Sequence, residues 1–212
     1  QLTPRAADSR RSAPLAAAAT VRHLTMDTPP LLSKLWLTAD RLGAERSTDP
    51  RFVLDPCGLL LERPPRRWDY FCTPLNSLTF ASTGGDGVHY GLLTIPGRSA
   101  DATPVVMTVP MAGTYNVVIA ETFEEFLGLG YFVGWYALEQ LTYQPSWAVR
   151  FFGRPRSDWP EREALLVHLR AALDIRHVPL RQRRIRHLQS TYLHLLQLPP
   201  EPQDPPIPVG GA

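Results

Sequence analysis

Residues 78–95 read LTFASTGGDGVHYGLLTI, and this stretch decides the fold. Two β-prone runs, 78–81 and 88–95, flank a glycine-rich turn at 83–87. This pattern predicts a β-hairpin whose glycines supply positive φ and whose Asp86 bonds its own backbone. A phosphate-binding loop does not fit, because no Gly-Lys-Ser/Thr follows, the turn leads into a strand, and Asp86 would repel phosphate. A solvent-facing recognition loop is the functional alternative for this turn.

Further strands and helices are expected on both sides of the hairpin. Short β-prone runs predict strands near 59–62, 105–109 and 116–120, and short turns between successive strands predict an antiparallel meander. Helical spacing of apolar residues occurs in segments 28–43, 122–127, 131–141, 158–173 and 180–196. Thr122 is expected to cap the second helix, and Asp158 with Pro160 to begin the fourth. The predicted fold class is α+β, an antiparallel sheet of about four to six strands flanked by helices in a single domain.

Length and composition set the domain organisation. The chain has 212 residues, which suits one domain. We expect a disordered N-terminal extension at 1–26, a folded body at 27–198, and a proline-rich disordered tail at 199–212. The first segment is rich in Ala, Arg and Ser, and we expect it to be either a mis-assigned upstream region or a processed leader.

Charge and hydropathy restrict the partners. The formal net charge is only +2, which does not indicate nucleic-acid binding by the whole surface, so we expect no direct nucleic-acid partner. No run of about 18 apolar residues occurs, so no membrane span is expected. Lys34 is the one lysine among 22 basic residues, a bias typical of a GC-rich, bacterial genome.

The reactive side chains show no catalytic or metal-binding motif. The two cysteines, Cys57 and Cys72, are too few for a secreted-type disulfide framework, so a reducing cytoplasm is the expected location, and a bridge between them stays open. The histidines lack ligand spacing, and His89 is expected to be a half-buried, hydrogen-bonded strand residue. We therefore predict no catalytic residue, no metal and no cofactor.

One long motif resembles a known family. Residues 73–91, TPLNSLTFASTGGDGVHYG, resemble the central sheet motif of the Smi/Knr-like proteins of the SUKH superfamily. Residues 104–110 and the later run NVVIAETFEEFL at 116–127 are similar to the next strands and helix of that family. The resemblance covers about residues 70–145, whereas the flanks match only in helical character.

The resemblance implies a binding function without catalysis. Many bacterial members are immunity proteins that bind and occlude a polymorphic toxin encoded nearby, often a nuclease. Other members, notably fungal ones, are regulatory or scaffold proteins, which is the alternative for this chain. The expected partner is thus a protein, in the first case a toxin domain.

Two charged runs and one aromatic run are candidate binding elements. Glu121, Glu124 and Glu125 stand where a helix begins and suit its dipole, but together with Asp86 they would also form an acidic edge for a basic toxin. The basic run at 176–186 is expected to be a solvated helix face, with contact to phosphates or an acidic partner as the alternative. The aromatic residues between 132 and 152 are expected to serve packing, although they are dense enough to line a pocket.

Overall fold

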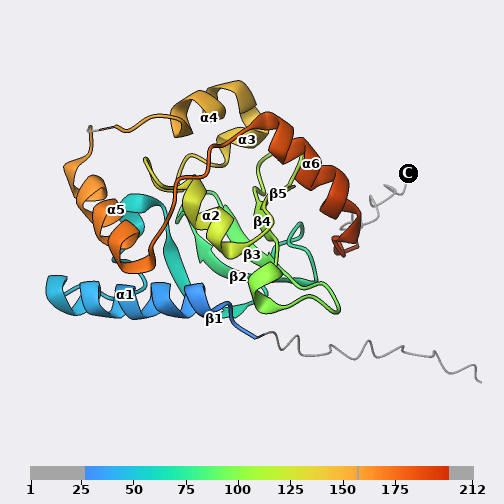
Figure 1. The fold of residues 1–212 in the computed structure, drawn as a ribbon. Helices are drawn as coiled ribbons and strands as arrows, with labels where there is room; N and C mark the ends of the chain where they lie inside the picture. Colours follow the sequence, from blue (N-terminus) through green and yellow to red (C-terminus); the bar gives the residue numbers. More distant parts are fainter. Residues whose placement is uncertain (1–26, 157, 201–212) are drawn as a thin grey trace, which may run out of the picture.

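One antiparallel sheet of five strands forms the middle of the molecule (Figure 1). The structure, a computed structural model, describes residues 27–156 and 158–200. Across the sheet the strands follow chain order: β1 (Leu60–Arg66), β2 (Ser77–Ser82), β3 (His89–Leu93), β4 (Val105–Thr108) and β5 (Asn116–Ala120). All neighbouring strands are antiparallel, which confirms the meander predicted from the short connections.

The turn between β2 and β3 has the backbone that its glycines predict. Gly84, Asp86 and Gly87 all have positive φ, a region that glycine enters without a Cβ clash. The Thr83 N–H donates to the Val88 carbonyl at 3.0 Å, and the Val88 N–H donates to the Gly85 carbonyl at 3.0 Å. The turn therefore closes through backbone hydrogen bonds and directs the chain back into β3.

Strand β1 extends further than the expected 59–62. It continues through Pro64 and Pro65 to Arg66, with an irregular register between Leu61 and Arg66. Proline is tolerated there because β1 is an edge strand and its pairing with β2 is irregular over these residues.

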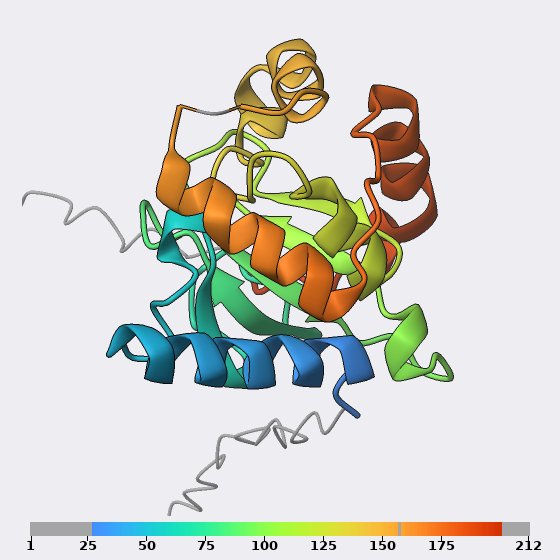
Figure 2. The same ribbon diagram turned by 60° about the vertical axis from the view of Figure 1, so that its left-hand side comes forward.

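In the described residues, six helices pack around the sheet. The helices are α1 (Pro30–Arg46), α2 (Phe123–Leu129), α3 (Gln140–Tyr143), α4 (Pro145–Phe152), α5 (Pro160–Leu173) and α6 (Gln182–Tyr192), with short 3-10 turns η1 (Asp55–Cys57), η2 (Ala100–Ala102) and η3 (Leu193–Leu195). Figure 2 shows α1 and α5 lying over one face of the sheet. Helix α6 lies beyond α2 in this view and packs against β5. The described part of the chain is thus one α+β domain.

Successive residues of a strand pack into two different hydrophobic cores. Leu92 packs into the large core beneath α1, α2 and α5, whereas the next residue, Leu93, packs with Leu188 and Tyr192 of α6. In β5, Ile119 belongs to the large core and Val118 to the smaller one. Successive strand residues point to opposite faces, so the central strands are buried on both sides.

The helix expected at 131–141 does not form, and this prediction is wrong. Turns occupy 131–139 before the short α3, and α4, which is not among the expected helices, follows at once. Gly134 has φ of 76°, and a Cβ there would lie 2.4 Å from the Cys57 carbonyl oxygen. This close approach lets the Trp135 N–H donate to that carbonyl at 2.7 Å, and the positive φ ends any helix.

The start of α5 also differs from the prediction. Trp159 is the N-cap residue and makes no side-chain cap bond. The Asp158 carboxylate instead accepts hydrogen bonds from Arg156 at 3.0 Å and from Arg162 at 3.2 Å. Arginine neighbours thus outcompete the backbone for this carboxylate, although Pro160 does occupy the first turn as predicted.

The last helix packs one face against the sheet. Leu188 and Tyr192 are buried, while Ile185 and Leu195 are partly buried against the same core. The extension expected at 1–26 and most of the tail expected at 199–212 lie outside the described residues. Of the helices in the described ranges, none combines the length and apolar character needed to cross a bilayer.

Candidate functional site

Glu125 is held by the chain segment that begins α2. The Glu125 N–H donates to the Thr122 hydroxyl at 3.0 Å, as predicted for a capping threonine. The Glu125 carboxylate in turn accepts the Glu121 N–H at 2.6 Å. This reciprocal arrangement is a variant of the capping box and fixes the Glu125 side chain at the start of the helix.

Arg184 of α6 closes over the same carboxylates. Its Nε and Nη2 donate to the two oxygens of Glu125 at 2.8 and 2.9 Å, and Nη2 also donates to Glu121 at 2.8 Å. The Tyr192 hydroxyl donates to the other Glu121 oxygen. We call Glu121, Glu125, Arg184 and Tyr192 the α6 junction, which ties α6 to the end of β5 and the start of α2.

The hydrogen bonds of the α6 junction shift its titration. The Tyr192 hydroxyl and then the Arg184 guanidinium lower the pKa of Glu121. The Glu125 carboxylate is the main cause that raises the pKa of Arg184. Each charge is therefore stabilised by a partner inside the fold, which is the arrangement of a structural ion-pair network.

The four predicted partner-binding residues do not form one acidic edge. Glu121 and Glu125 are neutralised by Arg184, and Glu124 is the exposed one of the three. Asp86 lies in the β2–β3 turn, close to His89 at the start of β3. His89 pairs with Thr108, and Thr108 pairs with Asn116, the first residue of β5. Glu121 follows the last residue of β5, so it lies at the opposite end of the sheet. Near Asp86 is Glu139, whose pKa is raised by burial and by the Asp86 charge. The idea that Asp86 joins the glutamates is wrong.

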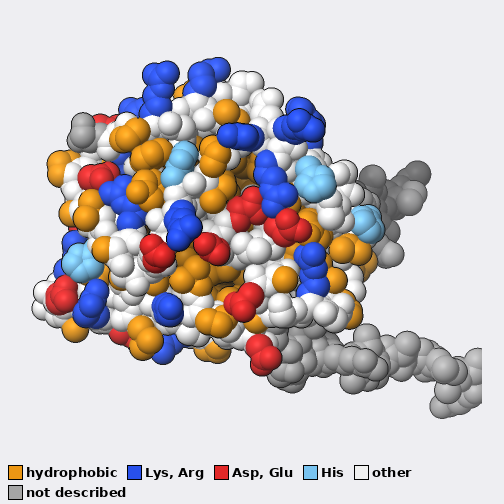
Figure 3. All heavy atoms as spheres, viewed as in Figure 1, with side chains coloured by type: hydrophobic (Ala, Val, Ile, Leu, Met, Phe, Trp, Pro, Cys, Tyr) orange, Lys and Arg blue, Asp and Glu red, His pale blue; other side chains and the backbone are white. Residues whose placement is uncertain are grey.

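The basic run at 176–186 also contains both exposed charges and a charge that is paired within the fold. Arg176, Arg181, Arg183 and Arg186 are exposed, as a solvated face requires. Arg184 departs from that prediction, because it turns inward and has only 34% of its side chain exposed. In the view of Figure 3, acidic side chains lie beside basic ones near the middle of the molecule. Further basic side chains lie along its upper edge, over α4 and the start of α6.

A group of exposed apolar side chains lies at the hairpin-turn end of the sheet. We call Tyr70, Phe71, Met111 and Tyr115 the sheet-end rim. Met111 is 75% exposed and Phe71 48%, and the Phe71 and Tyr115 rings meet edge to face at 5.2 Å. The loop after β1 leaves the opposite end of the sheet and returns to the β4–β5 loop, where the Asn116 amide of β5 bonds the Cys72 carbonyl.

Buried polar side chains hold the sheet-end rim in place. His89 Nε2 bonds the Thr73 hydroxyl at 3.0 Å, and Nδ1 bonds the Gly87 carbonyl at 2.7 Å. The Asn116 amide donates to the Cys72 carbonyl at 2.9 Å. Burial lowers the pKa of His89. His89 is thus hydrogen-bonded as predicted, although it is fully rather than half buried.

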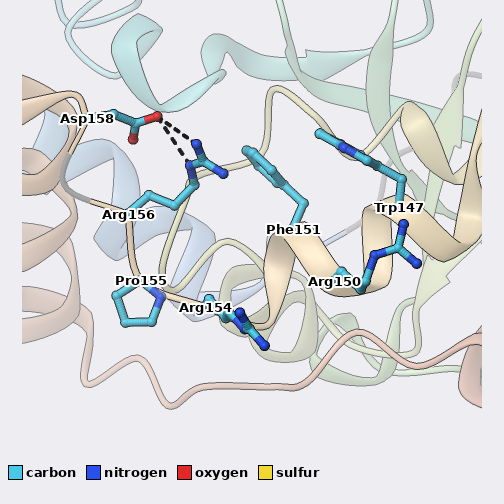
Figure 4. A pocket seen from close by; sticks show the side chains of 7 residues that line it. All are labelled: Trp147, Arg150, Phe151, Arg154, Pro155, Arg156 and Asp158. Atoms are coloured by element: carbon cyan, nitrogen blue, oxygen red, sulfur yellow. Dashed lines mark hydrogen bonds and ion pairs between the residues drawn. The ribbon is translucent and has the colours of Figure 1, made fainter.

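A hollow of about 600 Å³ lies beside α4, on another part of the surface (Figure 4). The hollow, which we call the α4 hollow, is lined by Trp147, Arg150, Phe151, Arg154, Pro155, Arg156 and Asp158. The Trp147 and Phe151 rings stack with centroids 4.5 Å apart, and the Arg156 guanidinium lies 5.1 Å from the Phe151 centroid. Arg156, Phe151 and Trp147 therefore form one continuous stack.

The charge around the α4 hollow is mostly basic. Its one carboxylate, Asp158, is already shared by Arg156 and Arg162. Arg150 and Arg154 are exposed, and within residues 27–156 and 158–200 neither side chain makes a hydrogen bond or ion pair. The first turn of α6 lies alongside, because Gln182 donates to the Ser146 hydroxyl at 3.1 Å, and Arg181 and Arg183 there are exposed.

The expectation that the aromatic run serves packing holds only in part. Trp135 and Phe152 are buried in the large core, whereas Trp147 and Tyr143 are 37% and 47% exposed. The sequence does carry a signal for the α4 hollow: residues 140–156 hold three arginines among four aromatic residues and no acid. Aromatic and basic residues in alternation without acids are typical of a binding surface.

Both cysteines are free thiols in structural positions. Cys57 is buried beside the Arg162 carbonyl, and desolvation raises the pKa of its thiol to about 12. Cys72 is also buried, and desolvation raises its pKa. A thiol whose pKa is raised has little thiolate at neutral pH, the form that reacts. In the described residues, no three His, Cys, Asp or Glu side chains gather as metal ligands would.

No protein-family model matches the chain, and no curated protein matches it.

Proposed function

We propose that the chain is a non-catalytic protein-binding domain, and more narrowly an immunity protein that neutralises a toxin encoded by a neighbouring gene. In this proposal the protein acts in the cytoplasm of a bacterium and occludes the active site of the toxin. The Smi/Knr-like resemblance of residues 73–127 motivates the narrower statement. A regulatory or scaffold protein of the same kind is the alternative.

The sheet-end rim is the observation that carries the proposal. Phe71, Met111 and Tyr115 expose apolar surface that a chain without a partner would gain from burying. Aromatic residues and methionine are enriched in the buried centres of protein interfaces. The rim is also preorganised, because the Asn116 and His89 hydrogen bonds fix its loops before a partner arrives.

His89, a titratable side chain near the sheet-end rim, has a structural role. Both ring nitrogens of His89 are occupied by protein groups, and Trp68 and Tyr70 pack against the ring at centroid distances of 5.0 and 5.6 Å. This imidazole acts as a support for the loop.

Co-expression with the product of the adjacent gene tests the proposal. If the chain is an immunity protein, it should restore growth to cells that express that product and should form a stoichiometric complex with it. The Met111→Glu variant should bind at least tenfold more weakly, because a charge would enter the apolar centre of the interface. Isothermal titration calorimetry measures the loss.

Leu37→Glu provides the matched control. Leu37 is 64% exposed on α1, away from the rim, and the same charge is introduced. This variant should bind within about twofold of the wild type. A complex that forms without rescue of growth would favour the scaffold alternative, and equal loss in both variants would exclude the rim as the contact surface.

A further inference from the structure

We propose that the α4 hollow binds single-stranded nucleic acid, with a base stacked on Trp147 and phosphates held by Arg150 and Arg154. The proposal goes beyond protein binding by the sheet-end rim and uses none of its residues.

The stack of rings ends at a surface that a base can extend. Arg156 lies over Phe151, and Phe151 stacks on Trp147 at an interplanar angle of 18° (Figure 4). Trp147 is the outer member and is 37% exposed. Proteins that bind single strands place bases on exposed aromatic rings of this kind, and every base has a suitable face.

The stack is also fixed before any ligand binds. Asp158 accepts from both Nε and Nη2 of Arg156, at 3.2 and 3.0 Å, and so holds the guanidinium over Phe151. Ala148 and Phe152, on the inner side of α4, are buried and anchor the helix. A base that stacks on Trp147 therefore meets a platform that needs little ordering.

The arginines next to the stack are available for phosphates. Asp158 is engaged by Arg156 and Arg162, whereas Arg150 and Arg154 face solvent. A guanidinium presents two parallel N–H donors that match phosphate oxygens. Figure 4 shows the Arg150 guanidinium on the Trp147 side of α4, where the phosphate of a stacked nucleotide would lie.

The balanced charge of the chain does not argue against this site. The net charge of +2 is a sum over all residues. It includes charges that are neutralised at the α6 junction, where Arg184 pairs with Glu121 and Glu125. Around the hollow, residues 140–156 contribute three arginines and no acid, and exposed Arg181 and Arg183 flank them. Local field, not net charge, attracts a polyanion to a groove.

A single strand fits these features better than an acidic peptide. Carboxylates would satisfy the arginines but would leave the exposed part of Trp147 without a partner. A nucleotide uses both, since it joins a flat ring to a phosphate. The hollow of about 600 Å³ has room for a nucleotide unit and is open at the surface, so a strand can continue beyond it.

Fluorescence anisotropy with a labelled oligothymidylate about 15 nucleotides long tests the proposal on the full chain. The wild type should bind with an affinity that falls as salt rises. Arg150→Gln with Arg154→Gln should weaken binding at least tenfold at low salt and reduce the salt slope by about 0.7 per lost phosphate contact. Trp147→Ala should weaken binding by about tenfold, whereas Trp147→Phe should retain most of it.

A charge-matched double variant separates this site from general attraction. Arg41→Gln with Arg66→Gln removes the same charge from exposed arginines on α1 and β1, and binding should stay within about twofold. Equal weakening by the two double variants, or full binding by Trp147→Ala, would overturn the proposal. Competition by polyglutamate as effective as that by unlabelled oligothymidylate would overturn it in favour of an acidic protein ligand.

Discussion

Arginine is common to two regions of the molecule that use it in opposite ways. At the α6 junction, Arg184 meets two carboxylates inside the fold, and each of its charged hydrogen bonds is 2.8 or 2.9 Å long. At the α4 hollow, Arg150 and Arg154 meet solvent. A charge that is neutralised within the chain contributes to structure, whereas a charge left without a partner is free to attract a ligand.

The comparison also separates two uses of aromatic rings. Tyr192 at the α6 junction is buried, and its hydroxyl donates to Glu121. Trp147 at the α4 hollow exposes more than a third of its surface and ends a stack. Truncation at the α6 junction should therefore lower stability, and truncation at the α4 hollow should lower binding.

The largest effect is expected where the α6 junction meets its apolar support. Leu188 is fully buried against Leu93 and Val118. Leu188→Ala should lower the free energy of unfolding by about 2–5 kcal/mol, because it removes apolar contacts and leaves a cavity. Urea unfolding followed by circular dichroism measures the change. Leu193→Ala, which truncates a 44% exposed leucine just beyond α6, should change it by less than about 0.5 kcal/mol.

Removal of the central guanidinium should have the next largest effect. Arg184→Met keeps the aliphatic stem of the side chain and leaves Glu121 and Glu125 without their counter-charge. We expect a loss of about 1–2 kcal/mol in the free energy of unfolding, reduced by the partial exposure of the pair. Arg186→Met on the exposed side of the same helix is the control and should change it by less than about 0.5 kcal/mol. Equal losses in the two variants would show that the α6 junction is not structural.

Much of the fold could be predicted because its signals are local. The β-prone runs on either side of the turn at Gly84 to Gly87 predict β2 and β3, and β5 begins and ends at the predicted residues, Asn116 and Ala120. The 131–141 segment failed because its conformation depends on a remote group. The Cys57 carbonyl accepts the Trp135 N–H, and no periodicity within the segment reports this contact.

The candidate site was harder to predict because pairing between distant charges decides it. Glu125 and Arg184 are 59 residues apart, so the sequence shows an acidic run and a basic run but not that they neutralise each other. Nothing in the sequence shows that Asp86 and the glutamates lie at opposite ends of the sheet, as the strands place them. The α4 hollow, in contrast, is contiguous in sequence and could have been found from its composition.

A pH titration sharpens the comparison through Glu121. Its folded-state pKa is lowered below the ordinary 4.5 by Tyr192 and Arg184, so its stabilising contribution is present above about pH 4.5 and is lost as pH falls through the lowered pKa. The gap in unfolding free energy between wild type and Glu121→Gln should therefore shrink from pH 6 to pH 3, by less than about 1 kcal/mol. His89, whose pKa is lowered from 6.5, destabilises both proteins as pH falls below that value and cancels in the difference.

The smallest effect on stability is expected at the α4 hollow. Arg150→Gln with Arg154→Gln should leave the free energy of unfolding within about 0.5 kcal/mol of the wild type, because neither side chain makes an ion pair in the described part of the chain. Thermal and urea unfolding in parallel with Arg184→Met measures the contrast directly. A loss above about 1 kcal/mol would mean that these arginines support the fold, and the distinction between the two regions would then fail. If stability is retained, the two arginines contribute nothing measurable to the fold. Their charges then remain available to bind a ligand.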